Sequence, residues 1–217
     1  MASVRLQKEG EPCRFCSILR GDLGYSYDTI LSASEGYSAI ASVGALVPGW
    51  VLICPTEHRL NMSELYADSR FTSLRLELAE KLRRRFDSPV RMFEHGPSCD
   101  ASPTGCGVNH AHTHLVPHAF SLSEGVARMS DALDWRSIRA SQLADSVRSR
   151  EYLFYSDHAQ SLDAVGAVAI LDAPVSQYFR KVIARQLRRD VEYDYRTHPN
   201  LFNVEATALA LYRETPH

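Results

Sequence analysis

The sequence lacks any long hydrophobic run, and this absence excludes one class of protein. Nowhere in the 217 residues is there an uninterrupted apolar stretch of the roughly 18 residues that a membrane-spanning helix needs. Residues 1–11 carry alternating charges and no apolar run of signal-peptide length. We therefore expect a soluble globular protein of the cytoplasm.

A strong net charge of either sign is also missing. The formal charge is -2 at pH 7 and the pI is about 6.5, so no general basic field attracts a polynucleotide backbone. Internal repeats and low-complexity tracts are absent as well. We expect a small-molecule substrate, with no polynucleotide and no membrane as partner.

Cysteine is too scarce for a disulfide framework. There are five cysteines, and an odd number without an export signal favours free thiols or metal ligands. Cys13 and Cys16 form a C-x-x-C unit that can hold zinc if two more ligands join it. A redox dithiol is the competing interpretation, although no thioredoxin-like βαβ pattern follows. Cys99 and Cys106 match no common metal spacing, and we interpret them as ordinary thiols.

The sequence does contain enough apolar residues for one core and a smaller second one, because 45% of it is hydrophobic. Its periodicity predicts both strands and helices. In the first half we expect strands at 37–43, 50–54 and 90–95, a turn at 47–49, a helix at 69–86 and a polar loop at 96–105. In the second half we expect strands at 152–155 and 165–171, a helix through Ile138, Leu143 and Val147, a helix capped by Ser176 and a final helix capped by Asn203.

The most informative stretch is a row of alternating histidines, His110, His112 and His114, followed by Leu-Val-Pro. On a strand these three side chains share one face, and the residues between them face a core. Imidazole titrates near neutral pH, so the row offers a nucleophile, a proton donor and a metal ligand. An expression tag or buried structural histidines are the alternatives, but the interior position and strict alternation argue against both.

Four features occur together in the order seen in the histidine triad (HIT) superfamily, which residues 13–118 resemble. They are Cys13-x-x-Cys16, Pro48-Gly49 before a strand ending in Pro55-x-x-His58, the lead-in Gly105-x-Gly107-Val108, and the triad itself with Leu115-Val116-Pro117. The resemblance implies an α+β fold in which an antiparallel sheet with a packed helix pairs with a second copy as a homodimer. We expect a HIT domain at 11–119 and a mixed helical and strand C-terminal extension at 120–217, packed on that domain or on the dimer partner.

The resemblance also implies an activity. In the family the middle histidine, here His112, attacks the α-phosphorus of a nucleoside phosphate derivative and forms a nucleotidyl-enzyme. His114 and backbone N–H groups near Gly105 and Gly107 would neutralise charge on the phosphate oxygens. In zinc-bearing members the ligands correspond to Cys13, Cys16, His58 and His110, a closed set that makes the zinc structural.

The sequence departs from the family pattern at three places near the expected site. Cys106-Gly107 stands where many members have Gln-Ser or Gln-Thr, Ser42 stands where Asn or Asp holds the ribose, and Trp50 replaces a histidine. These departures concern the substrate and the leaving group more than the nucleophile. We retain Ser42 as a substrate-binding candidate.

The resemblance beyond residue 120 is confined to a stretch around Ser176 to Arg180, which is similar to an extension in some larger family members. Gln177, Arg180 and Lys181 follow the expected helix start, where cations and the helix N-terminus suit a phosphate. We count Gln177 and Arg180 as substrate-binding candidates. A solvated helix face is the alternative for the basic residues.

Four functions fit these residues. The leading one is a nucleotidyl hydrolase acting on a dinucleoside polyphosphate or a nucleoside phosphoramidate. Its enzymatic rival is a phosphorylase or nucleotidyltransferase that passes the nucleotide to phosphate or a sugar phosphate. A hydrolase using zinc-bound hydroxide is disfavoured because the Cys-Cys-His-His set accounts for a closed zinc site. A nucleotide-binding module without catalysis is disfavoured by the intact triad.

Overall fold

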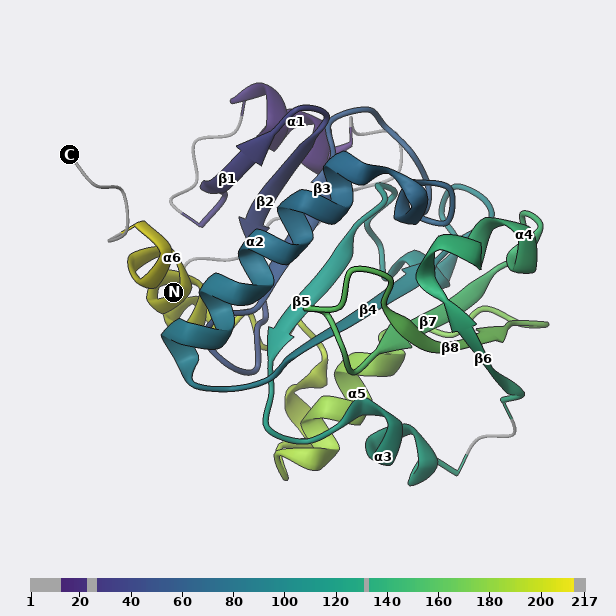
Figure 1. Cartoon of the computed structure of the whole chain (residues 1–217). Helices are drawn as coiled ribbons and strands as arrows, with labels where there is room; N and C mark the ends of the chain where they lie inside the picture. Colours follow the sequence, from purple (N-terminus) through teal and green to yellow (C-terminus); the bar gives the residue numbers. More distant parts are fainter. Residues whose placement is uncertain (1–12, 23–26, 131–132, 213–217) are drawn as a thin grey trace.

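One antiparallel sheet runs through the computed structural model, which describes residues 13–22, 27–130 and 133–212 (Figure 1). Its eight strands lie in the order β1-β2-β3-β5-β4-β7-β8-β6. They are β1 (Ile30–Ser34), β2 (Tyr37–Ala41), β3 (Val51–Pro55), β4 (Val90–Gly96), β5 (Thr113–Pro117), β6 (Trp135–Arg139), β7 (Tyr152–Ser156) and β8 (Val165–Ile170). The expected α+β fold, an antiparallel sheet with a packed helix, is confirmed.

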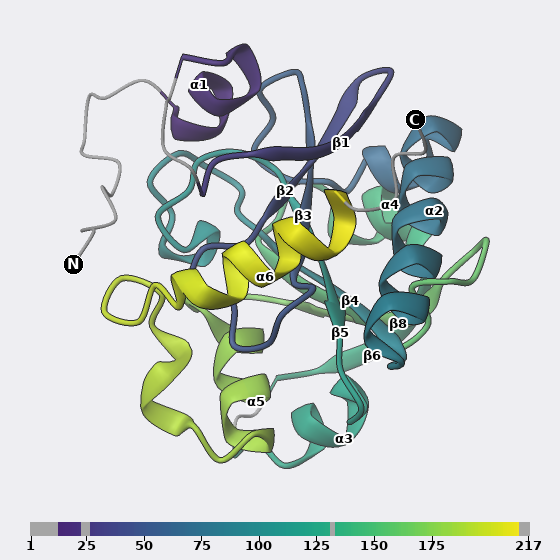
Figure 2. The same ribbon diagram turned by 90° about the vertical axis from the view of Figure 1, so that its left-hand side faces the viewer.

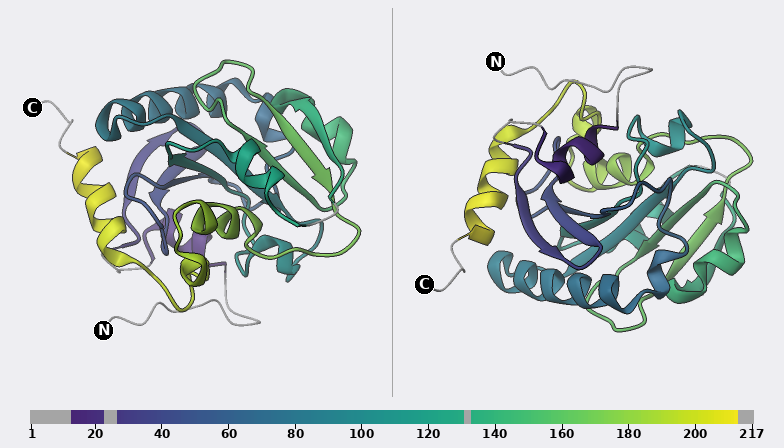
Figure 3. Two further views of the ribbon diagram at one scale, coloured as in Figure 1. Left: turned by 90° about the horizontal axis from the view of Figure 1, so that it is seen from below. Right: turned by 90° about the horizontal axis from the view of Figure 1, so that it is seen from above.

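Helices cover both faces of the sheet, as the views along its edge show (Figure 3). They are α1 (Arg14–Arg20), α2 (Ser69–Phe86), α3 (Leu122–Ala127), α4 (Leu143–Val147), α5 (Tyr178–Gln186) and α6 (Leu201–Tyr212). One core lies between the sheet and α2 with α4, and a second core lies between the sheet and α1, α3 and α5. In the part of the chain that is described, no helix is long and apolar enough to cross a membrane.

Helix α2 has the bounds that its apolar spacing predicts. Phe71, Leu74, Leu78 and Leu82 are buried at intervals of three and four residues, which places them on one stripe of the helix. Asp68 caps the first turn by accepting a hydrogen bond from the backbone of the helix. The helix lies along the sheet in both Figure 1 and Figure 2. It covers the face of the sheet that is opposite to the histidines.

The histidine motif is only partly a strand, which corrects the sequence-based expectation. Strand β5 begins at Thr113, so His110 and His112 lie in the preceding loop. The backbone N–H of Ala111 donates to Arg59 O instead of to a neighbouring strand, because the loop here turns His110 toward α1. The alternation nevertheless continues, since Ala111 and Leu115 pack in the core under α2 while His114 faces the other side.

The strands of the C-terminal half extend the sheet of the N-terminal half. Strand β7 pairs with β4 along its whole length, from Met92↔Ser156 to Gly96↔Tyr152, and β8 and β6 follow. Strand β4 therefore lies inside the sheet, with β5 on one edge and β7 on the other.

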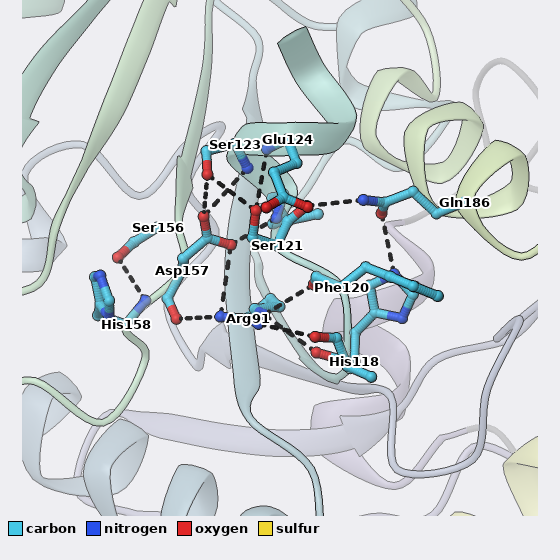
Figure 4. A network of polar contacts seen from close by, with 12 residues as sticks. Arg91, His118, Phe120, Ser121, Ser123, Glu124, Ser156, Asp157, His158 and Gln186 are labelled. Carbon is cyan, nitrogen blue, oxygen red and sulfur yellow. Dashed lines mark hydrogen bonds and ion pairs between the residues drawn. The ribbon is translucent and has the colours of Figure 1, made fainter. Parts of the chain in front are cut away.

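A polar network joins the two halves at the start of β4 (Figure 4). The guanidinium of Arg91 donates to the backbone oxygens of His118, Ala119, Phe120 and Asp157. The carboxylate of Asp157 accepts the first backbone N–H groups of α3, with an Oδ1 to Leu122 N distance of 2.6 Å. This network holds the chain that leaves β5 against the turn that leaves β7.

Three local expectations are wrong in the second half. Ile138 lies on β6, so the expected helix is reduced to α4. Helix α5 starts at Tyr178 after Gln177 in a left-handed conformation, so Ser176 is not its cap. Asn203 lies inside α6 and donates its side-chain N–H to Ala45 O at 2.7 Å. In the first half, the expected hairpin is present, because β2 pairs with β3 antiparallel and a turn lies at Pro48–Gly49 within the connection of residues 42–50.

Candidate functional site

A cavity opens between the sheet, α1, the loop after β2 and the C-terminal half. The cavity is partly open to solvent and has a mainly apolar wall. Its lining residues are Arg14, Phe15, Asp28, Ile40, Ala41, Ser42, Val43, Leu52, His95, Cys106, Val108, His112, His114, Arg180 and Tyr195. Sites that bind small molecules in proteins are typically lined by apolar side chains with a few polar groups among them, and this wall has that composition.

His112 presents one ring nitrogen to this cavity. Its Nδ1 lies 2.8 Å from the backbone oxygen of His110, and since a carbonyl oxygen only accepts, Nδ1 carries the proton. The lone pair of Nε2 is therefore available. Burial lowers the pKa of His112 below its ordinary value, which favours the neutral ring that a nucleophile requires.

His114 is held in the opposite tautomer. Nε1 of Trp50 lies 2.9 Å from its Nδ1, and an indole N–H only donates, so Nδ1 accepts and Nε2 carries the proton. The ring stacks on Phe93 at 4.2 Å and lies 4.8 Å from the His112 ring. His114 therefore offers an N–H donor beside the lone pair of His112.

Trp50 and His95 are site residues to which the sequence analysis assigned no role. Trp50 is fully buried and orients His114. In the sequence, the feature that pointed to Trp50 is that it stands where the family usually has a histidine. His95 lines the cavity from the end of β4. Alternation along the strand indicates its position. Phe93 pairs with His114, and His95, two residues further on, lies on the same face of β4 as Phe93.

Arg180 comes from α5 to the cavity wall and is 3% exposed, so it does not belong to a solvated helix face. Its guanidinium donates to Gly44 O, donates to Tyr193 O at 2.7 Å, and lies 5.0 Å from the Trp50 ring. Burial lowers its pKa to about 10, which leaves it cationic at neutral pH. Lys181 instead lies over the Tyr193 ring.

The remaining substrate-binding candidates are divided between the cavity and its surroundings. Ser42 lines the cavity. Gln177 does not line it, and its amide donates to Asp194 Oδ1 at 3.1 Å. Gly105 and Gly107 lie on either side of Cys106, which lines the cavity wall. Gly107 has a φ of +80°, and a Cβ there would lie 2.7 Å from an Arg196 nitrogen, so glycine is required.

The four expected metal ligands come together beside the cavity. The ligand atoms of Cys13, Cys16, His58 and His110 all lie within 4.8 Å of one another. The Sγ to Nδ1 distances are 3.4 Å for Cys13–His110, 3.4 Å for Cys16–His58 and 3.5 Å for Cys16–His110. Zinc bonds of ordinary length in a tetrahedron place S and N about 3.6 Å apart. The cluster can therefore hold a metal ion.

His110 is oriented for that role by a further contact. Its Nε2 lies 2.8 Å from Pro55 O, so Nε2 donates and Nδ1 is left unprotonated toward the cysteines. Burial lowers the pKa of His110 to about 4, which keeps the ring in the neutral form that a metal ion binds.

Comparisons with known proteins give structural matches only. No family model and no curated protein matches the sequence. A Hit-like protein from Bartonella henselae has 16% identity and a TM-score of 0.38, over 49% of this chain and 79% of its own. A HIT family hydrolase from Clostridium thermocellum has 25% identity and a TM-score of 0.36, over 52% of this chain and 93% of its own.

A third match is a hypothetical histidine triad nucleotide-binding protein from Sulfolobus tokodaii, with 23% identity and a TM-score of 0.35 over 50% of this chain and 70% of its own. All three are named as HIT or histidine triad proteins. The resemblance of this chain to the histidine triad superfamily therefore lies in its sequence motifs, the alternating histidines and the residues of the Cys-Cys-His-His cluster.

Proposed function

We propose that the protein is a nucleotidyl hydrolase that acts on nucleoside phosphate conjugates through a covalent nucleotidyl-histidine at His112. The observation that carries this proposal is the hydrogen bond from His112 Nδ1 to His110 O. It leaves the Nε2 lone pair of a residue that lines the cavity free to react and stabilises the imidazole in one orientation.

The proposed reaction has two steps. In the first, Nε2 of His112 bonds to the α-phosphorus, and the bond from phosphorus to the leaving group breaks with its electron pair on the leaving group, which takes up a proton from solvent. In the second, water attacks the same phosphorus and gives up a proton to solvent, the N–P bond returns its electrons to His112, and a nucleoside 5′-monophosphate forms. His114 would donate Nε2–H to a non-bridging oxygen in both steps, and Arg180 would add positive charge nearby.

The substrate class follows from the wall of the cavity. Phe15, Ile40 and Val43 line it with apolar surface suited to a nucleobase, and Ser42 offers a hydroxyl for the ribose. A dinucleoside polyphosphate or a nucleoside phosphoramidate supplies both a nucleoside and an α-phosphorus with a leaving group. Gly105 and Gly107 would contribute through the backbone of their loop, and Gln177 by holding the segment that carries Tyr195.

Zinc is the metal that fits the cluster best, since two thiolates and two imidazoles form its common closed site. Bound there, it would supply structure by joining α1 to the chain before β5. It leaves no open position for a substrate, so the reaction above uses the side chains of the cavity alone.

A rapid-quench experiment with a radiolabelled nucleotide conjugate tests the proposal. Wild-type protein should show acid-labile label in a single turnover, and His112→Ala should show none while folding normally, with kcat lower by several orders of magnitude. His158→Ala is the matched control, because His158 is exposed and absent from the cavity. Label that survives in His112→Ala, or activity that returns with zinc and never gives label, would refute the proposal.

Transfer to phosphate or a sugar phosphate is the second candidate, and Arg180 favours it. A buried cation on the cavity wall suits the phosphate of an acceptor in the second step. Product analysis by mass with and without inorganic phosphate separates the two. A nucleoside diphosphate formed only with phosphate would establish transfer, and a monophosphate in both conditions would establish hydrolysis.

A further inference from the structure

Three imidazoles line the cavity, and their hydrogen bonds differ in one respect. Nδ1 of His112 donates to a carbonyl oxygen, and Nδ1 of His114 accepts from Trp50. His95 has its Nε2 3.3 Å from the backbone N of Phe179, in the first turn of α5. Its Nδ1 is buried and has no hydrogen-bond partner among the residues that are described.

The contact with Phe179 determines where the proton of His95 lies. A backbone N–H only donates, so Nε2 accepts and is unprotonated. Burial, with nearby His112 and Arg180, lowers the pKa of His95 to about 3, and the ring is neutral at physiological pH. A neutral ring that accepts at Nε2 must carry its proton at Nδ1, so the atom without a partner is an N–H donor.

Strand register places this donor beside the reacting groups. His95 lies two residues beyond Phe93, which pairs with His114 across β4 and β5. The His95 and His114 ring centroids are 6.0 Å apart. His95 lines the same cavity as His112 and His114. An α-phosphate attacked by His112 would occupy this part of the cavity, and its oxygens are hydrogen-bond acceptors.

We propose that His95 is a substrate-binding residue whose Nδ1–H donates to a phosphate oxygen of the bound nucleotide. The inference rests on the proposed function, since it takes the α-phosphate to lie beside His112. A buried N–H without a partner costs folding free energy, and a phosphate oxygen would satisfy it. Because His95 is neutral, it adds a donor without adding a charge that must be desolvated.

Two substitutions separate the two nitrogens of His95. Asparagine places an amide donor near the position of Nδ1 and loses the contact with Phe179. Glutamine reaches the position of Nε2, keeps an acceptor for Phe179 N–H and loses the Nδ1 donor. Calorimetric titrations with adenosine, guanosine, cytidine and uridine, and with their 5′-monophosphates, measure both variants against wild type.

The expected result is a loss confined to one variant and to one type of ligand. His95→Gln should bind the preferred 5′-monophosphate about tenfold more weakly and the matching nucleoside with unchanged affinity, since one hydrogen bond is lost. His95→Asn should recover most of the monophosphate affinity. An unchanged monophosphate affinity in His95→Gln, an equal loss for the nucleoside, or no recovery in His95→Asn would overturn the inference.

A measurement on wild-type protein makes the test independent of how the variants fold. Long-range ¹H–¹⁵N spectra should show His95 protonated at Nδ1, with that nitrogen shifting on addition of the 5′-monophosphate and not of the nucleoside. An Nε2-protonated ring, or equal shifts with both ligands, would contradict it. Wild type that binds no nucleotide would overturn the inference, whereas wild type that binds nucleotide but never gives covalent label would overturn only the proposed function.

Discussion

At the scale of single residues, the indole of Trp50 decides which nitrogen of His114 carries the proton. Removing the indole N–H while keeping an aromatic ring should free His114 to adopt either tautomer. We predict that Trp50→Phe lowers kcat about fivefold with a smaller change in KM, since one buried hydrogen bond of about 1 kcal/mol is lost.

Trp135→Phe is the matched control for this prediction. The Trp135 indole also packs against Phe179, but its Nε1 has no partner among the described residues. Steady-state kinetics should therefore show little change in that variant. An equal loss of kcat in both variants would mean that packing of the indole ring, and not the tautomer of His114, accounts for the effect.

Glu94 gives a prediction about stability at the same scale. It is fully buried on β4, accepts a hydrogen bond from Met62 N at 2.6 Å, and has its pKa raised to about 8 by burial. Its ordinary pKa is 4.5, so between about pH 4.5 and 8 the folded state holds a proton that the unfolded state releases. The free energy of unfolding should fall as pH rises through this range.

Glu94→Gln removes the titration and keeps the shape of the side chain. Urea unfolding at about pH 5, 7 and 8.5 should show a steeper loss of stability with pH in wild type than in the variant, and the variant should be the more stable protein at the highest pH. Parallel pH profiles of the two proteins would show that Glu94 is not protonated in the folded state.

At the scale of elements, the Cys-Cys-His-His cluster connects α1 to the loop that carries His110 and His112. We predict about one zinc per chain, and a lower thermal stability in Cys16→Ser or after chelation, because binding energy of a structural metal is folding energy. Metal analysis and thermal unfolding measure both. Cys99→Ser is the matched control, since Cys99 is exposed and outside the cluster.

Protein purified without chelators that contains no metal would contradict the zinc prediction. A Cys16→Ser protein that loses catalysis at full thermal stability would instead indicate that the metal acts in the reaction. The structural proposal requires the reverse, with stability lost first and the chemistry of the remaining folded protein largely kept.

Elements with a regular apolar stripe or a continuous apolar run were predictable from the sequence, and elements set by distant contacts were not. The apolar stripe of α2 and the apolar runs of β4, β7 and β8 gave their positions to within a residue or two. Strand β6 was missed because its Trp135–Arg139 residues are half exposed at the edge of the sheet. The start of α5 depends on Gln177, whose positive φ goes with contacts to Asp194 and Cys106.

In the candidate site, too, residues marked by a local motif were predictable and residues placed by distant contacts were not. The motif and the family resemblance predicted a site of His112, His114 and four Cys and His side chains, and the structure brings His112 and His114 to one cavity and the other four into one cluster beside it. They did not identify Asp28, whose carboxylate pairs with Arg14 at the cavity wall. Nor did they show that Arg180 is buried, since that follows from carbonyl groups of Gly44 and Tyr193 that are remote in the sequence.

At the scale of the whole molecule, the sheet limits how a homodimer can form. Strand β4 is paired on both edges, so among the described strands only β1 and β6 have an edge open to a second copy. We propose a two-fold homodimer that uses one of these edges or the outer face of α2. Light scattering at micromolar concentration tests it, and a monomer there would refute it.

The shared sheet also predicts the behaviour of a shortened chain. A protein of residues 1–119 would keep the histidine motif, but β4 would lose β7, and the core beside His114 would lose Phe179. We predict that it unfolds at markedly lower urea concentration than the full chain, or aggregates through the open edge of β4. A cooperative transition at the position of the full chain would show that residues 120–217 are dispensable for folding.

The central position of β4 has a consequence for synthesis on the ribosome. About 55 residues separate the end of β4 at Gly96 from the start of β7 at Tyr152, and translation at roughly 5–20 residues per second takes several seconds to cover them. During that interval β4 has already been made, and the edge of β4 that will pair with β7 has no partner. A codon change that slows translation between these strands should lengthen the exposure and increase the fraction of newly made protein that needs a chaperone.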